Sequence, residues 1–249
     1  MTRRKLITTG LATAAGASGL AVAARLAAKY GLVPPDSGGI YGVGETLTYG
    51  AQRLLMANHS LAREFDRSMI TKFVPVDGHP PQNETYQRLR ADKFAGWRLK
   101  VDGLVARPAL LSVAELKSYP SRTQITHQAC EEGWSFIAEW TGVPLSFVLN
   151  TLGVQPQARY VVYFAMDDSW DSIDMPEALH PQTLLAYGRN GEELPPDYGA
   201  PLRMKVPRQL GYKNVKFLSR ITVTDSLKNI RNGQGSISPD YGYSWYAGI

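Results

Sequence analysis

The chain contains a single cysteine, Cys130, which limits the disulfides and metal centres that could stabilise the fold. One cysteine cannot close an intramolecular disulfide or hold a cysteine-ligated iron–sulfur cluster. A structural zinc site takes four protein ligands, so Cys130 and the nearby His127 do not suffice for one. The sequence also has no Cys-x-x-Cys-His motif for haem attachment. The globular part of the chain must therefore fold around an ordinary hydrophobic core.

The N-terminal segment has the form of a bacterial export signal. Arg3 and Arg4 are followed by Lys5 and by an uncharged run, rich in Ala, Gly, Thr and Leu, that lasts to Ala24. Adjacent arginines before such a run are typical of twin-arginine signals. We therefore expect residues 1–29 to be a twin-arginine signal or a retained N-terminal anchor, and we expect the protein to be periplasmic.

The excess positive charge of the chain lies in this same segment. The 27 Lys and Arg residues exceed the 22 Asp and Glu residues by five. Five cations precede Asp36, the first acid, so the rest of the chain carries 22 charges of each sign. A neutral body gives no reason to expect a nucleic-acid-binding surface.

Turn residues and hydrophobic patterns divide the remainder. Residues 30–72 contain a turn-rich linker at 34–39 and an apolar pattern that predicts a short helix over 51–65. Residues 73–249 are expected to form one globular unit around a single core.

Strand patterns outnumber helix patterns in this unit. Two short helices are expected, one starting at a capping box of Ser112 and Glu115, the other running from Pro144 to Gly153. No glycine-rich loop joins a strand to a helix as in nucleotide-binding folds. We therefore predict a β-rich α+β domain of mixed sheets with short flanking helices. Alternating or continuously apolar strands are expected at 97–102, 122–126, 159–165, 202–206 and 215–223.

Cys130 follows the strand expected at 122–126 and precedes the polar turn formed by Glu131, Glu132 and Gly133. Three roles are open: a buried core thiol, a nucleophile activated by a base such as His127, or a ligand for a soft metal. The polar neighbours argue against the core. The adjacent carboxylates argue against a free thiolate, because negative charge raises a thiol pKa.

A second notable feature is a basic stretch without any acid in it. It follows the turn-rich residues 194–201 and includes the loop at 211–214. Cations on a strand, together with loop amides, could bind a phosphate or another anion. The alternative is a solvated strand face. The basic residues are Arg203, Lys205, Arg208, Lys213, Lys216 and Arg220.

Six short motifs occur in a characteristic order. Gly-Trp follows Cys130, and the others are Gly-Val-Pro-Leu at 142–145, His-Pro-Gln-Thr at 180–183, Gly-Ala-Pro-Leu-Arg at 199–203, Gly-Tyr-Lys at 211–213 and Trp-Tyr-Ala-Gly-Ile at 245–249. Together they resemble the sulfite oxidase-like molybdopterin-dependent oxidoreductases. This superfamily includes the bacterial protein-methionine-sulfoxide reductase catalytic subunit. The resemblance implies a sulfite oxidase-type molybdopterin-binding catalytic domain over residues 73–249.

The resemblance also implies site residues. Cys130 matches the catalytic thiolate that ligates molybdenum beside the dithiolene of one molybdopterin. Tyr198 stands where relatives usually carry His or Asn, Asp77 where many carry Asn, and Ala165 near a cofactor-contacting Thr. These departures concern individual polar contacts more than the fold or the metal ligand. The expected cofactor-binding residues are Asp77, Tyr198, Arg203, Lys213, Asn214, Val215 and Lys216.

Three aromatic or acidic positions near these motifs have two possible roles each. Trp134 is either a core residue or part of a cavity wall, and we expect the core. Asp167 and Asp168 follow the strand expected at 159–165 and either line a substrate pocket or lie in a solvated turn.

The activity implied by the resemblance is that of a periplasmic molybdenum enzyme that oxidises a sulfite-like oxyanion or reduces an S-oxide or N-oxide. Without haem or iron–sulfur motifs, it would exchange electrons with a separate cytochrome or membrane haem subunit. A monomer is expected, because the immunoglobulin-like dimerisation domain of larger sulfite oxidases is missing. The alternatives are a non-catalytic binding or assembly protein with the same fold, and a cofactor-free thiol enzyme.

Overall fold

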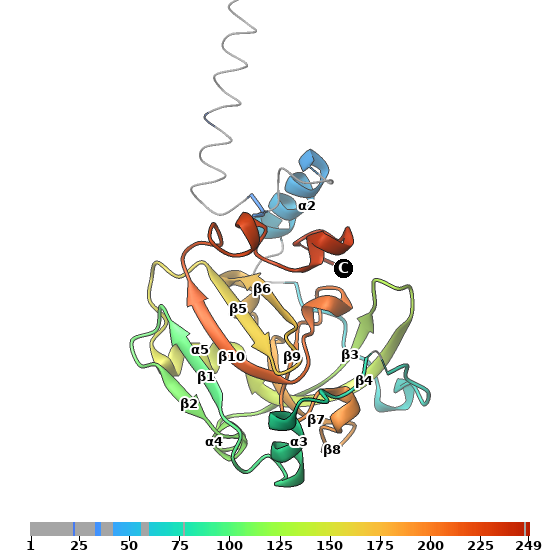
Figure 1. Ribbon diagram of the computed structural model, residues 1–249. Helices are drawn as coiled ribbons and strands as arrows, with labels where there is room; N and C mark the ends of the chain where they lie inside the picture. The colour runs from blue at the N-terminus through green and yellow to red at the C-terminus, as the bar shows by residue number, and fades with distance from the viewer. Residues whose placement is uncertain (1–21, 23–32, 36–41, 56–59, 77, 247) are drawn as a thin grey trace, which may run out of the picture.

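The computed structural model describes residues 22, 33–35, 42–55, 60–76, 78–246 and 248–249 (Figure 1). The predicted export signal, apart from Val22, and the candidate residue Asp77 lie outside this part of the chain. Within these ranges, no helix combines the length and the apolar composition that crossing a membrane requires.

The strands form two five-stranded sheets. The first has the order β2-β1-β10-β5-β6, in which β1 and β10 pair parallel and the other neighbours pair antiparallel. The second has the order β3-β4-β7-β8, and β9 pairs with β7. The first sheet consists of β1 (Leu99–Gly103), β2 (Ala109–Leu111), β5 (Tyr160–Ala165), β6 (Trp170–Asp174) and β10 (Leu218–Thr224). The second consists of β3 (Arg122–Ala129), β4 (Ser135–Pro144), β7 (Leu184–Arg189), β8 (Glu192–Glu193) and β9 (Arg203–Lys205).

Short helices flank the sheets, which confirms the predicted β-rich α+β class. In α4, the Ser112 side chain accepts from the amide of Glu115, and the Glu115 carboxylate accepts from the amide of Ser112, as the capping box predicts. α5 ends at Gly153, whose φ of 73° is left-handed. The α-helices are α2 (Gly42–Leu55), α3 (Glu84–Ala91), α4 (Val113–Ser118), α5 (Leu145–Leu152) and α6 (Met175–Ala178). Short 3-10 helices are η1 (Arg67–Met69), η2 (Pro196–Tyr198), η3 (Gly211–Lys213), η4 (Arg231–Gly233) and η5 (Ser238–Tyr241).

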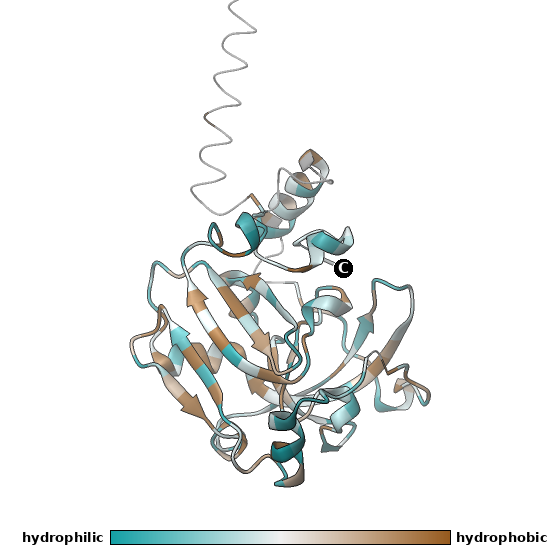
Figure 2. Cartoon of the chain, viewed as in Figure 1, coloured by the Kyte–Doolittle hydropathy of each residue, from teal (hydrophilic) through white to brown (hydrophobic). Residues whose placement is uncertain are grey.

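The main core lies between the two sheets. Val101, Val161 and Ile221 reach it from the first sheet, while Val143 and Leu185 reach it from the second. Hydrophobic and hydrophilic residues alternate along β1 and β10 of the first sheet (Figure 2). This alternation buries one face of these two strands, and the loops at the strand ends are left to form sites.

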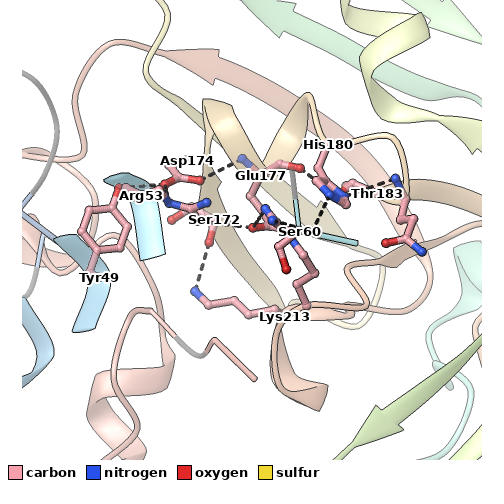
Figure 3. Close-up of polar contacts among 11 residues, drawn as sticks. Tyr49, Arg53, Ser60, Ser172, Asp174, Glu177, His180, Thr183 and Lys213 are labelled. Carbon is pink, nitrogen blue, oxygen red and sulfur yellow. Dashed lines mark hydrogen bonds and ion pairs between the residues drawn. The ribbon is translucent and has the colours of Figure 1, made fainter. Parts of the chain in front are cut away.

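The helix predicted over 51–65 is wrong in its bounds, since α2 occupies Gly42–Leu55 and residues 60–66 are not helical. The buried ring of Tyr49 and the ion pairs of Arg53 fix this helix, and not the predicted apolar pattern. Arg53 lies between two carboxylates: its Nε is 2.6 Å from Oδ2 of Asp174, and its Nη2 is 3.2 Å from Oε2 of Glu177 (Figure 3). Leu54, which suggested an apolar face, is 71% exposed.

Two strands also differ from expectation. β10 starts at Leu218 rather than at 215, because Phe217 has a φ of 53° and the register with β5 shifts between Leu218 and Arg220. Every residue of β9 is buried. The solvated strand face considered for the basic stretch is therefore wrong for β9.

Candidate functional site

A cavity of about 420 Å³ lies where loops from both sheets meet. Its wall contains the end of β3, the turn after it, β6, β9 and the segments around η2, η3 and η5. Cys130 lies in this wall, close to Gln128 and Trp134. The strand end and loop position predicted for the thiol is confirmed.

A tight turn holds Cys130 against the cavity. The amide of Cys130 donates to the carbonyl of Trp134 over 2.8 Å, and the amide of Gly133 donates to the carbonyl of Cys130 over 3.1 Å. Gly133 has a φ of 92°, which favours glycine at this position. The turn therefore fixes the thiol at the cavity while leaving only 7% of the residue exposed to solvent.

The electrostatic surroundings keep the thiol protonated. Burial, helped by the carboxylate of Glu131, raises the pKa of Cys130 to about 12, against the effect of a backbone hydrogen bond. Sγ lies 3.4 Å from a carboxylate oxygen of Glu131 and donates to it. His127 does not line the cavity, and side-chain alternation along β3 turns it away from the face of Gln128. A base-activated nucleophile is therefore disfavoured, whereas a bound metal would stabilise the thiolate.

Five of the expected cofactor-binding residues line the cavity that contains Cys130. They are distant from it in sequence and are brought there by η2, β9 and the loop after η3. Asp77 lies outside the described residues, but its neighbour Gly78 is in the cavity wall. Ala165 is buried in the main core and is not in the wall. The five residues are Tyr198, Arg203, Asn214, Val215 and Lys216.

Arg203 holds two of these segments together. Its guanidinium donates to the carbonyl of Tyr198 over 2.9 Å and to that of Asn214 over 2.8 Å. Lys216 donates to the carbonyl of Asp197 over 3.2 Å, and Gly199, at a φ of 110°, passes so close that a Cβ there would lie 2.9 Å from Lys216. The segments 197–199 and 214–216 are thus held together beside the cavity.

Lys213 differs from the other expected residues, because it does not line the cavity. It is fully buried, and its Nζ lies 2.5 Å from Asp171 and 3.0 Å from the carbonyl of Ser172 (Figure 3 shows the latter contact). Asp171 itself lies in the wall and accepts from Ser238 over 3.1 Å. Lys213 thus supports the wall from behind, and its side chain is not placed to contact a ligand in the cavity.

The cavity wall also contains residues whose role the sequence left open or did not indicate. Trp134, expected in the core, is half-buried, lines the cavity, and stacks on Phe136 with 6.0 Å between ring centroids. Asp167 lines the cavity, whereas Asp168 does not. The C-terminal segment contributes Ile237, Ser238, Tyr241 and Tyr243, which come from η5 and the residues beside it and have no periodic signal.

The donor set suits a metal that arrives with an organic cofactor. Among the described residues, no group of three His, Cys, Asp or Glu side chains is placed to hold a metal ion. The cavity instead offers the sulfur of Cys130 together with the cationic side chains of Arg203 and Lys216. One soft ligand beside two cations fits a metal whose other ligands belong to an anionic cofactor.

Comparisons with known proteins agree with this geometry. A family model described as "Oxidoreductase molybdopterin binding domain" matches residues 86–230. A protein of Azospira oryzae, provisionally named protein-methionine-sulfoxide reductase subunit YedZ1, is 37% identical over 197 residues, covering 79% of this chain and 71% of that protein. The protein-methionine-sulfoxide reductase catalytic subunit MsrP of Xanthomonas axonopodis pv. citri is 37% identical over 151 residues, covering 54% of this chain and 47% of the relative.

A solved structure shares the fold. The sulfane dehydrogenase SoxCD from Paracoccus pantotrophus matches with a TM-score of 0.50 and 26% identity, covering 53% of this chain and 40% of that one. The chain thus matches about half the length of MsrP and less of SoxCD.

Proposed function

The chain belongs to the family of oxidoreductase molybdopterin-binding domains, and from this premise we propose that it is a periplasmic enzyme that reduces S-oxides, with methionine sulfoxide in proteins as the substrate class. Two relatives whose names describe methionine-sulfoxide reductases support this class. The cofactor would be molybdenum with one molybdopterin, held by Cys130, Arg203, Asn214, Val215 and Lys216.

The side chains that line the cavity carry the choice of substrate. They include the rings of Trp134 and Trp170 and the carboxylates of Glu131, Glu132 and Asp167. Carboxylates repel a sulfite-like oxyanion. A sulfoxide is neutral and carries apolar substituents that aromatic rings can contact. The wall therefore favours the neutral S-oxide over the anion.

The reaction requires an oxygen-atom transfer that no side chain of this cavity performs. The cofactor, when bound, would supply that chemistry. The protein provides a buried sulfur at Cys130, whose proton must leave when a metal binds. Trp134 and Tyr241 contribute aromatic rings to the cavity lining. Overall, a sulfoxide takes up two electrons and two protons, and gives a sulfide and water.

The electrons would come from a separate redox protein, a cytochrome or a membrane haem subunit. The sequence has one cysteine and no haem attachment motif, which supports an external donor. The twin-arginine pattern at residues 1–29 supports export of the folded, cofactor-loaded protein.

The test is a pair of dye-linked assays on protein matured in a host that makes molybdopterin. Reduced benzyl viologen should be oxidised when a peptide containing methionine sulfoxide is added, and Cys130→Ala should abolish this activity. Sulfite-dependent reduction of ferricyanide without sulfoxide turnover would overturn the substrate assignment. Bound molybdenum without either activity would favour the non-catalytic binding protein.

A further inference from the structure

Three cations surround one buried indole. Trp140 on β4 is fully buried, and the guanidinium carbons of Arg189 and Arg203 lie 5.8 Å and 4.8 Å from its ring centroid. Nζ of Lys205 lies 5.4 Å from the same centroid. The cations come from β7 and β9, which pair in the second sheet. We call Arg189, Arg203, Lys205 and Trp140 the Trp140 cation group.

Lys205 is buried without a negative partner. None of its surface is exposed, and the acceptor it reaches among the described residues is the neutral amide oxygen of Gln128, 3.1 Å away. An ammonium has three donors and a charge whose burial is costly unless it is paired. Burial lowers the pKa of Lys205 well below its usual range, and the charge of Arg203 adds to this effect. Gln128 cannot neutralise such a charge.

A second buried lysine, Lys213, has its charge balanced by a carboxylate. Lys213 is also fully buried, but its Nζ lies 2.5 Å from the carboxylate of Asp171. The two lysines therefore form a matched pair, one with a counter-ion and one without a counter-ion among the described residues.

Arg189 repeats the pattern of Lys205. Its Nε and Nη2 atoms are buried and have no hydrogen-bond partner in the described part of the chain. The guanidinium lies 3.8 Å from the ring centroid of Tyr198 and 5.9 Å from that of Phe136. Aromatic faces attract a cation, but less strongly than an anion does. Burial lowers the pKa of Arg189.

The Trp140 cation group lies directly behind the cavity wall. Gln128, Phe136, Tyr198 and Arg203 contact the group or belong to it, and all four line the cavity. Molybdopterin carries a phosphate and a dithiolene, both of which are anionic. A ligand of that kind in the cavity would bring negative charge next to the uncompensated cations.

We propose that Lys205 and Arg189, which do not line the cavity themselves, act from behind its wall as cations whose counter-ion is the anionic cofactor, in addition to the residues that the family motifs indicate. This rests on the proposed cofactor but is independent of the proposed substrate. Without cofactor, the charges of Lys205 and Arg189 destabilise the fold. In the loaded protein, the same charges help to retain the cofactor.

The sign of a mutational effect tests this. Lys205→Met keeps the length of the side chain and removes its charge. In protein made without cofactor, we expect it to raise the melting temperature by roughly 3 °C or more, because it removes a buried unpaired charge. In the cofactor-loaded protein we expect that gain to disappear, and the molybdenum content to fall several-fold. Arg189→Met should act in the same direction.

The experiment compares full-length chains matured in hosts with and without molybdopterin synthesis, by thermal unfolding and by molybdenum and pterin analysis. Lys213→Met is the matched control, which should lower the melting temperature in both states because it leaves Asp171 unpaired. Inorganic phosphate should raise the melting temperature of cofactor-free wild type more than that of Lys205→Met.

Two results would overturn the proposal. If Lys205→Met lowers the melting temperature equally in both states, Lys205 is a structural donor to Gln128. If it raises both equally and the molybdenum content is unchanged, the charge does not act on the cofactor. Wild type without molybdenum in a competent host would instead contradict the proposed function. Bound molybdenum without sulfoxide turnover would contradict the substrate alone.

Discussion

The thiol of Cys130 should be unusually unreactive when no metal is bound. Its pKa is raised from 9.0 to about 12, chiefly by burial and further by Glu131. Three pKa units correspond to an about 1,000-fold smaller thiolate fraction at neutral pH, and the thiolate is the form that alkylating reagents attack. We therefore expect cofactor-free, folded protein to react with iodoacetamide about 1,000-fold more slowly than an exposed peptide thiol.

Mass spectrometry of time points between pH 6.5 and 9.5 measures this rate. The rate should rise about tenfold per pH unit without a plateau, because the whole range lies below the pKa. Glu131→Gln should speed the reaction by removing the carboxylate that Sγ contacts. The same chain unfolded in urea should react at the ordinary rate. Rapid alkylation of the folded protein with a plateau below pH 8 would refute the reasoning and support a thiol enzyme.

Three further predictions concern stability. Arg53→Ala should lower the free energy of unfolding by about 3–5 kcal/mol, because Asp174 and Glu177 lose a buried cation. Urea unfolding measures this loss, with the exposed substitution Lys228→Ala as the control. A normal midpoint for Arg53→Ala would contradict the docking of α2. Gly142→Ala should cost about 3 kcal/mol or more and reduce soluble yield, because its Cβ would lie 2.3 Å from the carbonyl of Leu185 between β4 and β7. Between about pH 9 and 12, Cys130 keeps its proton in the folded state and loses it in the unfolded state. The free energy of unfolding should therefore fall with rising pH, and it should fall more in cofactor-free wild type than in Cys130→Ala. Parallel curves of unfolding free energy against pH would contradict the raised pKa.

Local sequence signals predicted much of the scaffold of the site. The capping box at Ser112, the left-handed Gly153 and the apolar run of β5 are each decided by neighbouring residues, and each was confirmed. The strand before Cys130 was predicted for the same reason, and β3 extends it to the thiol.

Long-range packing decided the features that the sequence could not predict. α2 is fixed by Arg53 against carboxylates more than a hundred residues away, which no local pattern indicates. Tyr241 reaches the cavity through a 3-10 helix, which has no useful periodicity, and the turn at Gly133 places Trp134 in the cavity wall, the less favoured of its two expected roles. Alternating Arg203 and Lys205 suggest a solvated strand face, but both faces of β9 are covered.

The most direct test of the central claim is the number of sulfur ligands on the metal. X-ray absorption at the molybdenum edge, on wild type and Cys130→Ala matured in the same competent host, counts them. The account predicts that the variant keeps the pterin sulfurs and has one sulfur ligand fewer than wild type. An equal sulfur count in both proteins, or wild type that contains no molybdenum, would contradict the assignment of Cys130 as the metal ligand.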